Sequence, residues 1–308
     1  MSVSKHFPFT SKLQPEVAAQ PRLGLNPLLL REWIEIDERW AEFTALKSQL
    51  LRDERENVFR VLPEAFESCF ELRETVAEHL AEFFPDRFQF SNPELIVGGQ
   101  RFLAPGSAEE ALEQVSLWTQ EDWALLSAAP PVHFEAGSIC FPSRWSLAEK
   151  IGKSSDLIHG PVPAFATIAK PTASFLERIT MERPVWRLNW SIHNSDQLYS
   201  PAHQKRVESA LTPSNVLEGT WLRIERQTLR RLPRTSAVVF SIRTYLHRMS
   251  EVASDDEQRQ LALETIQALP PEALAYKGMA PFAGALLEAL RSYDGKKLNA
   301  QENAQENA

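Results

Sequence analysis

Hydrophobic and polar residues follow two periodicities along this chain, one typical of helices and one typical of β-strands. Between residues 27 and 56, apolar residues recur at steps of three and four, which predicts an amphipathic helix. A second helix is predicted from about 63 to 84, led by Pro63 and ended at the FFPD stretch. Between 90 and 130 the strand signal is weak apart from PELIVGG, and Ser107 with Glu110 fits the capping box of a further helix.

From about residue 131 the pattern changes to alternation. The stretches VHFEAGSICFPSRW and VWRLNWSIH alternate, and TWLRIERQTLRRLPRTSAVVFSIRTYLHRM reads as two strands joined by a turn from Pro233 to Ser236. A sheet of at least four mostly antiparallel strands is therefore expected. An acid-capped helix that ends at Leu269 and a closing helix at APFAGALLEALRSY follow it. The fold class is α+β.

The two ends of the chain differ from its middle in composition. Residues 1–25 are Pro-rich without a period, so they are expected to form an extended arm. Residues 296–308 form a short repetitive polar tail that has nothing to bury, and we expect it to be disordered. Residues 26–295 are left as a single domain.

The predicted sheet carries polar side chains in columns, because alternate residues of a strand share one face. Solvation of such a face is common in antiparallel sheets, but a free surface is usually rich in Lys and Glu. These columns instead use side chains that make directed hydrogen bonds, which favours an enclosed polar site or an internal network. The three columns, expected on one face, are Arg187, Asn189, Ser191 and His193; Arg223, Glu225 and Gln227; and Ser241, Arg243, Tyr245 and His247.

Composition excludes several classes of function. The net charge of −8 would repel a nucleic-acid backbone. Cys69 and Cys140 are the only cysteines, too few for a disulfide framework or for the four ligands of an ordinary iron–sulfur cluster. The N-terminal residues do not indicate a signal peptide, and there is no run of about 18 apolar residues, so we expect a cytoplasmic protein without a membrane helix.

Recognisable loops for nucleotides and the hydrolase elbow are also absent, since neither G-x-G-x-x-G, G-x-x-x-x-G-K-[ST] nor G-x-S-x-G occurs. His159 stands between a short helix from Ser146 to about Ile151 and the Gly160–Pro161 step, with no second ligand at a metal-binding spacing. Such a histidine is more often structural than a ligand. A tetrapyrrole needs only one axial histidine, so heme is the metal site that this sequence can build.

Four blocks in order along the chain resemble one known family. They are CFPSRWSLAEKIGKSSDLIHGPVP, WRLNWSIHNSDQLYSP, LRIERQTLRRLPRTSAVVFSIRTYL and LAYKGMAPF. Together they resemble the heme-dependent oxidative N-demethylase alpha-subunit-like family, from about RLGLNPL to LLEAL. The resemblance implies a PAS-like heme-binding antiparallel sheet with added N- and C-terminal helices, so that residues 26–295 form one PAS-like heme domain.

The resemblance also implies NADPH-dependent oxidation of dimethylamine by O2 on a heme b subunit. FMN, a 2Fe-2S cluster and tetrahydrofolate would belong to partner subunits, because this chain has neither a dinucleotide motif nor enough cysteines for a cluster. A partner reductase is therefore expected to supply the electrons. The alternatives are a PAS-like heme sensor or binding protein without turnover, and a scaffold that has lost heme.

The resemblance gives provisional roles to individual residues. His159 is the expected axial ligand, with His193 and His247 as alternatives. Guanidinium groups pair well with carboxylates, and the arginines expected to hold the heme propionates are Arg223, Arg226 and Arg243. Glu225 is expected either to bind a cationic amine or to form an ion pair with Arg223 or Arg243. The residues expected to hydrogen-bond oxygen or substrate are Asn189, Ser191 and Tyr245.

Overall fold

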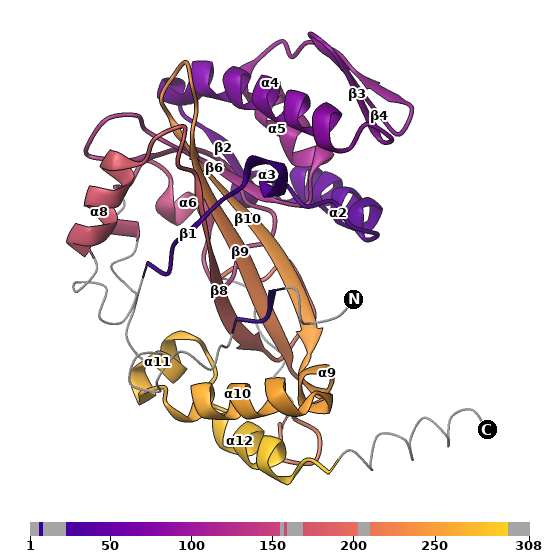
Figure 1. Cartoon of the computed structure of the whole chain (residues 1–308), viewed down its shortest axis with the longest axis vertical. Helices are drawn as coiled ribbons and strands as arrows, with labels where there is room; N and C mark the ends of the chain where they lie inside the picture. Colours follow the sequence, from indigo (N-terminus) through magenta and orange to yellow (C-terminus); the bar gives the residue numbers. More distant parts are fainter. Residues whose placement is uncertain (1–5, 9–22, 155–156, 159–168, 203–209, 295–308) are drawn as a thin grey trace.

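The computed structural model describes residues 6–8, 23–154, 157–158, 169–202 and 210–294. Its centre is an antiparallel sheet of seven strands in the order β1-β8-β9-β10-β6-β7-β2, shown in Figure 1. The α+β class predicted from the sequence is confirmed. The bounds of the seven strands are β1 Asn26–Pro27, β8 Val185–His193, β9 Trp221–Arg231, β10 Val238–Arg248, β6 Asp122–Leu126, β7 Phe134–Ser138 and β2 Phe59–Val61.

The longest strands are the ones whose alternation is clearest in the sequence. Strands β9 and β10 form a hairpin whose register runs from Arg231 opposite Val238 to Trp221 opposite Arg248. The predicted turn lies in the connection between them, where Ser236 has a φ of 61°. Strand β8 pairs along the other edge of β9. These three strands form the long ribbon that runs through the middle of Figure 1.

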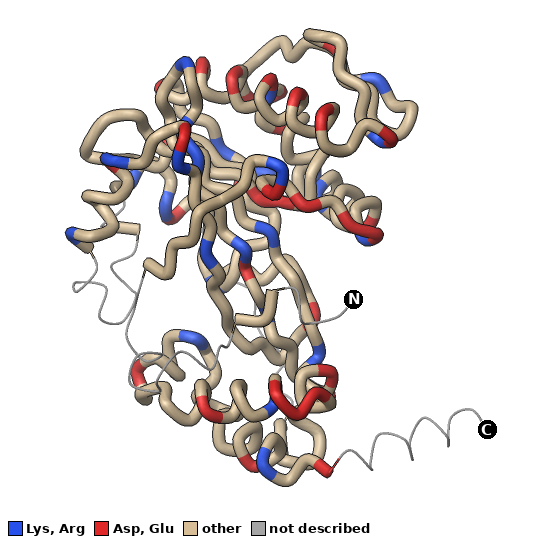
Figure 2. Tube along the Cα trace, viewed as in Figure 1, with Lys and Arg blue, Asp and Glu red and all other residues tan. Residues whose placement is uncertain are grey.

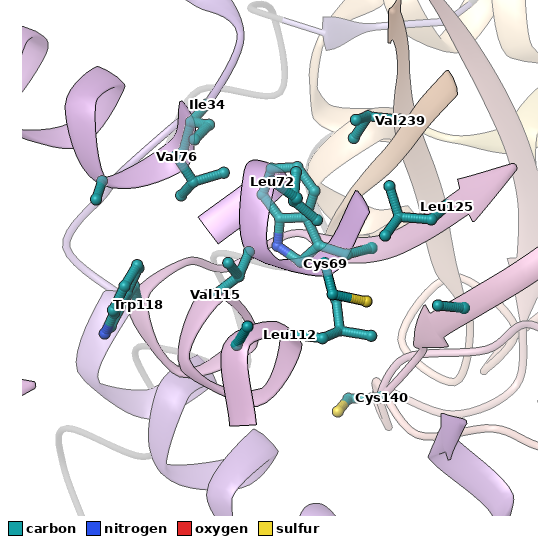
Figure 3. Packing of buried hydrophobic residues seen from close by; sticks show 14 of the residues in the cluster. Ile34, Cys69, Leu72, Val76, Leu112, Val115, Trp118, Leu125, Cys140 and Val239 are labelled. Carbon is teal, nitrogen blue, oxygen red and sulfur yellow. The ribbon is translucent and has the colours of Figure 1, made fainter. Parts of the chain in front are cut away.

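Helices from the first half of the chain cover one end of the sheet. They are η2 Leu30–Glu32, α2 Trp40–Asp53, α3 Arg55–Val58, η3 Pro63–Ala65, α4 Phe66–Phe83 and α5 Ala108–Trp118. A small sheet of β3 Phe88–Ser91, β4 Glu94–Val97 and β5 Gln100–Phe102 lies beside α4. Figure 3 shows the core between these helices and the sheet, where Leu72 and Val76 of α4 pack near Leu125 and Val239 of the strands.

Helices from the end of the chain cover the opposite end of the ribbon (Figure 1). Ile192, Leu222 and Ile224 of the strands pack in one cluster with Val252, Ile266 and Leu286 of these helices. The four helices are α9 Met249–Ser254, α10 Asp256–Gln267, α11 Pro271–Tyr276 and α12 Ala283–Ser292. The predicted helices after the sheet are confirmed.

The face of the sheet that points away from α4 is covered by two helices, α6 Leu147–Lys150 and α8 Ala169–Arg178. Leu147 of α6 packs near Phe240 of β10, and Leu176 of α8 packs with Leu229 of β9. The guanidinium of Arg231 fixes the end of α8, since it donates to the carbonyl oxygens of Leu176 and Ile179 at 3.0 and 2.8 Å.

Two expectations about the first half of the chain are wrong. The helix predicted over 27–56 begins only at Trp40, because the backbone N–H groups of Glu35 and Asp37 donate to the side chains of Glu121 and Gln120 and not to helical carbonyls. The segment Asp122–Leu126, which gave no strand signal, is strand β6 inside the sheet. Its residues are almost all buried, so it lacks alternation.

The polar tail and most of the N-terminal arm lie outside the described residues, so both remain predictions. Within the described part of the chain, no helix is long and apolar enough to span a membrane.

Candidate functional site

The register of the strands separates the predicted polar columns onto two faces. Asn189 of β8 lies opposite Glu225 of β9, so their columns share one side of the sheet as predicted. Glu225 lies opposite Thr244 of β10, whereas Tyr245 lies opposite Ile224. The third column, Ser241, Arg243, Tyr245 and His247, therefore points to the opposite side, and the expectation of three columns on one face is wrong.

We call the side that carries the β8 column and Arg223, Glu225 and Gln227 the Glu225 face. The side that carries Arg226 and the β10 column is the Tyr245 face. Both faces place arginines and carboxylates at the middle of the ribbon. Figure 2 shows basic positions along these strands and many acidic positions on α2 and the segment before it.

Glu225 is held by three side chains of its own face. Arg223 lies 3.4 Å from its Oε1, while Asn189 and Gln227 donate to its Oε2 at 3.2 and 3.1 Å. Arg223 is fully buried and also donates to the carbonyl oxygens of Phe141 and Leu198 at 2.5 and 3.1 Å. Of the two partners expected for an ion pair with Glu225, the structure gives Arg223, since Arg243 lies on the other face.

Further along this face, His193 is a buried histidine that contacts two hydroxyl groups. Its Nε2 lies 2.9 Å from Ser191 Oγ and 3.2 Å from Ser143 Oγ. Ser191 therefore meets His193, and the pair extends the polar column toward the end of β8.

Three further cations are influenced by Glu225, and none of them forms an ion pair with a carboxylate of the described residues. The charge of Glu225 acts on Arg187, Lys150 and Lys277, and in each case burial is the larger influence. Burial lowers the pKa of both Lys150 and Lys277 to about 8, and it lowers the pKa of Arg187. Because Glu225 already accepts three donors, its carboxylate does not balance the charges of these cations.

The same face becomes apolar next to the Arg187 row. Val185, Leu229 and Phe240 stand in the adjoining row of the sheet and pack with Leu126 and with Phe175 of α8. Val185, Leu126 and Phe240 are only half-buried. The Glu225 face thus joins an apolar wall to a basic, polar end.

On the Tyr245 face, the arginines bind groups of the N-terminal segment. Arg243 donates to Asp37 Oδ2 at 2.5 Å, and Arg226 donates to the carbonyl oxygen of Glu32 at 2.5 Å. The Tyr245 hydroxyl bonds to the Glu35 carboxylate, and burial raises its pKa strongly. Arg226 and Arg243, expected to hold propionates, are therefore bound to groups of the protein itself.

The predicted axial ligands are not gathered in one place. His159 lies outside the described residues, His193 is on the Glu225 face and His247 is on the Tyr245 face, 3.8 Å from Glu251. Burial lowers the pKa of His247 to about 4. Within the described ranges, no group of three or more His, Cys, Asp or Glu side chains is placed to hold a metal ion.

Sequence reasoning missed Lys150 and Lys277 as members of this site and gave Arg187 no role beyond its column. Lys277 reaches the edge of β8 from the turn after α11, where its Nζ donates to the Trp190 carbonyl oxygen at 2.5 Å. Arg144 packs against Gly278 of that turn, where an added Cβ would lie 1.6 Å from the guanidinium. The only available signal was that both lysines fall within the blocks that carry the family resemblance.

An α+β protein with a half-buried apolar wall and a basic rim on one sheet face is suited to bind a large, partly anionic group. Comparison with known protein families identifies the class of protein. A model of the family "Haem-dependent oxidative N-demethylase, alpha subunit-like" matches residues 24–287 of the 308-residue chain. The chain belongs to this family, whose description is that of a heme-dependent oxidoreductase, and the predicted resemblance is confirmed.

The residues of the Glu225 face fit a heme group. Heme is an apolar plate with two carboxylates on one edge, and this face offers apolar side chains next to unbalanced cations. The buried Nε of Arg187 has no hydrogen-bond partner among the described residues, and the same is true of the Nε of Arg243 on the other face. The terminal nitrogens of Arg243 bind Thr244 and Asp37, whereas the side chain of Arg187 has no hydrogen bond to a described residue and can donate to a bound acceptor.

Proposed function

We propose that this chain is the catalytic heme subunit of an oxidative N-demethylase that acts on a small methylated amine such as dimethylamine. In the overall reaction the amine, O2, two electrons and two protons give the demethylated amine, formaldehyde and water. The electrons would come from NADPH through a partner reductase. FMN, a 2Fe-2S cluster and tetrahydrofolate would be carried by the partner subunits, since this chain has only two cysteines, both buried and free.

The family match over residues 24–287 is the observation that carries this proposal. The Glu225 face supports it independently, because its apolar wall and basic end suit heme b. An antiparallel sheet with helices on the binding face also agrees with a PAS-like core. The heme, when bound, would supply oxygen activation and electron transfer, while the side chains of this chain bind, orient and shield the reactants.

His159 remains our first choice for the axial ligand. The described residues on both sides of its segment lie on the Glu225 face, since Ile158 packs near Phe240, and Phe175 of α8 packs near Leu229. His193 lies on the same face, but its Nε2 contacts two hydroxyls. His247 lies on the opposite face, which makes it the weaker alternative.

Asn189 and Ser191 are proposed to orient the substrate from the polar end of the Glu225 face. Both are half-buried, and Asn189 is fixed by its bond to Glu225. A role for Glu225 as counter-ion of the amine stays a prediction. An ammonium substrate would compete for the Glu225 carboxylate with three cations of the chain, Arg223, Lys150 and Lys277. Tyr245 would have to act from the other face, where it binds Glu35. Arg223 would fix the position of the Glu225 carboxylate.

The proposal is tested first by the absorption spectrum of the protein expressed with ample heme supply. We expect a Soret band that corresponds to about one heme per chain. His159→Ala should weaken or shift it strongly, whereas His133→Ala, a change at another half-buried histidine, should leave it unchanged. A band that responds only to His193→Ala would move the ligand to that residue, and the absence of any band would refute the heme assignment.

Turnover separates an enzyme from a heme sensor. With a reductase system and dimethylamine, the heme-loaded protein should form formaldehyde and consume one O2 for each amine oxidised. Heme binding without amine-dependent formaldehyde, across a panel of methylated amines and reductases, would favour the sensor.

A further inference from the structure

His193 stands where three segments of the chain meet at the polar end of the Glu225 face. It is the last residue of β8, and its Nε2 lies 2.9 Å from the Oγ of Ser191 on the same strand. The same nitrogen lies 3.2 Å from the Oγ of Ser143, in the segment that follows β7. The imidazole is buried, whereas both serines are only half-buried. One enclosed nitrogen therefore contacts two partly accessible hydroxyls.

The segment that carries Ser143 is fixed by backbone contacts. Ser143 forms an isolated parallel bridge with Ser200, and the Arg144 N–H donates to the Ser200 carbonyl oxygen at 2.7 Å. Arg223, a fully buried residue of β9, donates to one carbonyl oxygen in each of these two segments. Because Arg223 also lies 3.4 Å from the Glu225 carboxylate, the serine–histidine group has a fixed position relative to that carboxylate.

A single imidazole nitrogen between two hydroxyls is suited to pass on a proton. The nitrogen accepts a hydrogen bond when it is unprotonated and donates one when it is protonated, while each hydroxyl can do either and can rotate. A proton that enters through one hydroxyl can thus leave through the other without movement of the heavy atoms. Histidine is also the side chain that most often serves as a general acid or base.

We propose that His193 transfers protons to the substrate site of the Glu225 face, that Ser191 hands them on, and that Ser143 positions the imidazole and connects it to solvent. This inference rests on the proposed function, whose overall reaction consumes two protons for each O2. In each transfer, Nε2 gives a proton to the Ser191 hydroxyl, which gives its own proton to the oxygen that is being reduced. Nε2 regains a proton from solvent water through the Ser143 hydroxyl, so the imidazole returns to its first state.

The main test compares His193→Gln with the wild type in the heme-loaded protein. With a reductase system and dimethylamine, His193→Gln should form formaldehyde about 100-fold more slowly, as expected when a proton-transfer group is lost. The KM for the amine should change by less than about twofold, because His193 acts through Ser191. Oxygen that is reduced but not protonated in the site should leave and take its protons from water, so more hydrogen peroxide should form for each O2 consumed. The Soret band should be unchanged.

Ser143 offers a milder change with a matched rescue. Ser143→Ala should slow formaldehyde formation by about tenfold, the effect of one hydrogen bond lost from the transition state, and Ser143→Thr should restore most of the rate. The solvent deuterium isotope effect on this rate should rise in Ser143→Ala and return in Ser143→Thr, which a purely structural role would not produce. Ser200→Ala removes a half-buried hydroxyl that makes no hydrogen bond to His193 within the described ranges, so it should leave the rate unchanged.

Nuclear magnetic resonance of the heme-free protein tests the geometry without turnover. With isotope-labelled histidine, the Nε2 resonance of His193 is identified by its loss in His193→Gln. It should shift in both Ser143→Ala and Ser191→Ala, because both hydroxyls contact this nitrogen. A shift in only one of the two variants would refute the shared contact. Circular dichroism shows whether each variant retains the fold, and if His193→Gln does not fold, the Ser143 variants decide.

The outcomes separate this inference from the proposed function. If the wild type forms no formaldehyde from any methylated amine, the proposed function is refuted and the inference with it. If the wild type turns over and His193→Gln keeps its rate, only the inference is refuted. Two further results would also refute the inference alone: loss of the Soret band in His193→Gln, which would make this residue the axial ligand, and equal rates and isotope effects in Ser143→Ala and Ser143→Thr.

Discussion

The two faces of the central ribbon use the same kinds of residues for different ends. On the Tyr245 face, Arg243 and Arg226 each have an acceptor in the segment that runs from η2 to α2. On the Glu225 face, Arg223 is bound in the same way, but Arg187 is not. The Nε of Arg243 also lacks a partner among the described residues, but its terminal nitrogens bind Thr244 and Asp37, so this arginine serves the fold. The side chain of Arg187 has no hydrogen bond to any described residue, which is expected of a side chain that binds a ligand.

The largest effect is expected from removing a partner on the Tyr245 face. Arg243 is 1% exposed and 2.5 Å from Asp37. Asp37→Asn keeps the shape but leaves a buried guanidinium without its counter-charge, so it should lower the free energy of unfolding by about 3 kcal/mol in urea titrations. The matched control is Glu42→Gln, whose partner Arg39 forms an exposed pair worth about 0.5 kcal/mol or less. Equal effects of the two changes would show that the Tyr245 face is not a structural network.

A second, smaller effect should appear as a pH dependence of stability that arises at the edge of β8, where Lys277 contacts Trp190. Lys277 has a pKa of about 8 in the folded chain and an ordinary value of 10.5, and the charged groups that act on it are Glu225, Arg187 and Arg144. Between these two values the unfolded chain binds more protons, so this lysine makes folding more favourable as the pH rises from about 8 to 10.5.

Lys277→Met should abolish that contribution. Relative to the wild type, the heme-free variant should lose on the order of 1–2 kcal/mol of stability between pH 8 and pH 10.5, measured by urea unfolding at each pH. The control is Lys153→Met, which replaces an exposed lysine. Its free energy of unfolding should change with pH in the same way as that of the wild type. If the free energies of unfolding of Lys277→Met and the wild type differ by the same amount at every pH, the Lys277 ammonium is not desolvated in the folded chain.

Much of the ribbon was predictable because its pattern is local. Alternation within β8 and within β9 fixes which residues share a face of each strand, and the pairing of Asn189 with Glu225 follows from two adjacent columns that pack together. The column of β10 could not be assigned, because a shift of one residue in the hairpin register exchanges Tyr245 for Thr244 on the Glu225 face.

Other parts of the site depend on contacts between distant segments. The N–H group of Glu35 bonds to Glu121, 86 residues away, and this contact replaces the helix that the local pattern predicts. Lys277 reaches Trp190 across 87 residues. Neither contact can be predicted from periodicity or composition. The family resemblance indicates only which blocks of the sequence belong to the site.

The smallest expected effect is also the sharpest contrast with Asp37. Arg187→Gln in the heme-free protein removes a guanidinium that has no bond to lose at its Nε and that is desolvated beside Lys277. The free energy of unfolding should therefore change by less than about 0.5 kcal/mol or rise slightly, since relief of desolvation and of repulsion from Lys277 offsets the lost packing and the lost attraction to Glu225. With hemin bound, the same change should destabilise the protein, because the guanidinium then has an acceptor. A loss of several kcal/mol already in the heme-free state would place Arg187 with the structural arginines of the Tyr245 face and remove the distinction between the two faces.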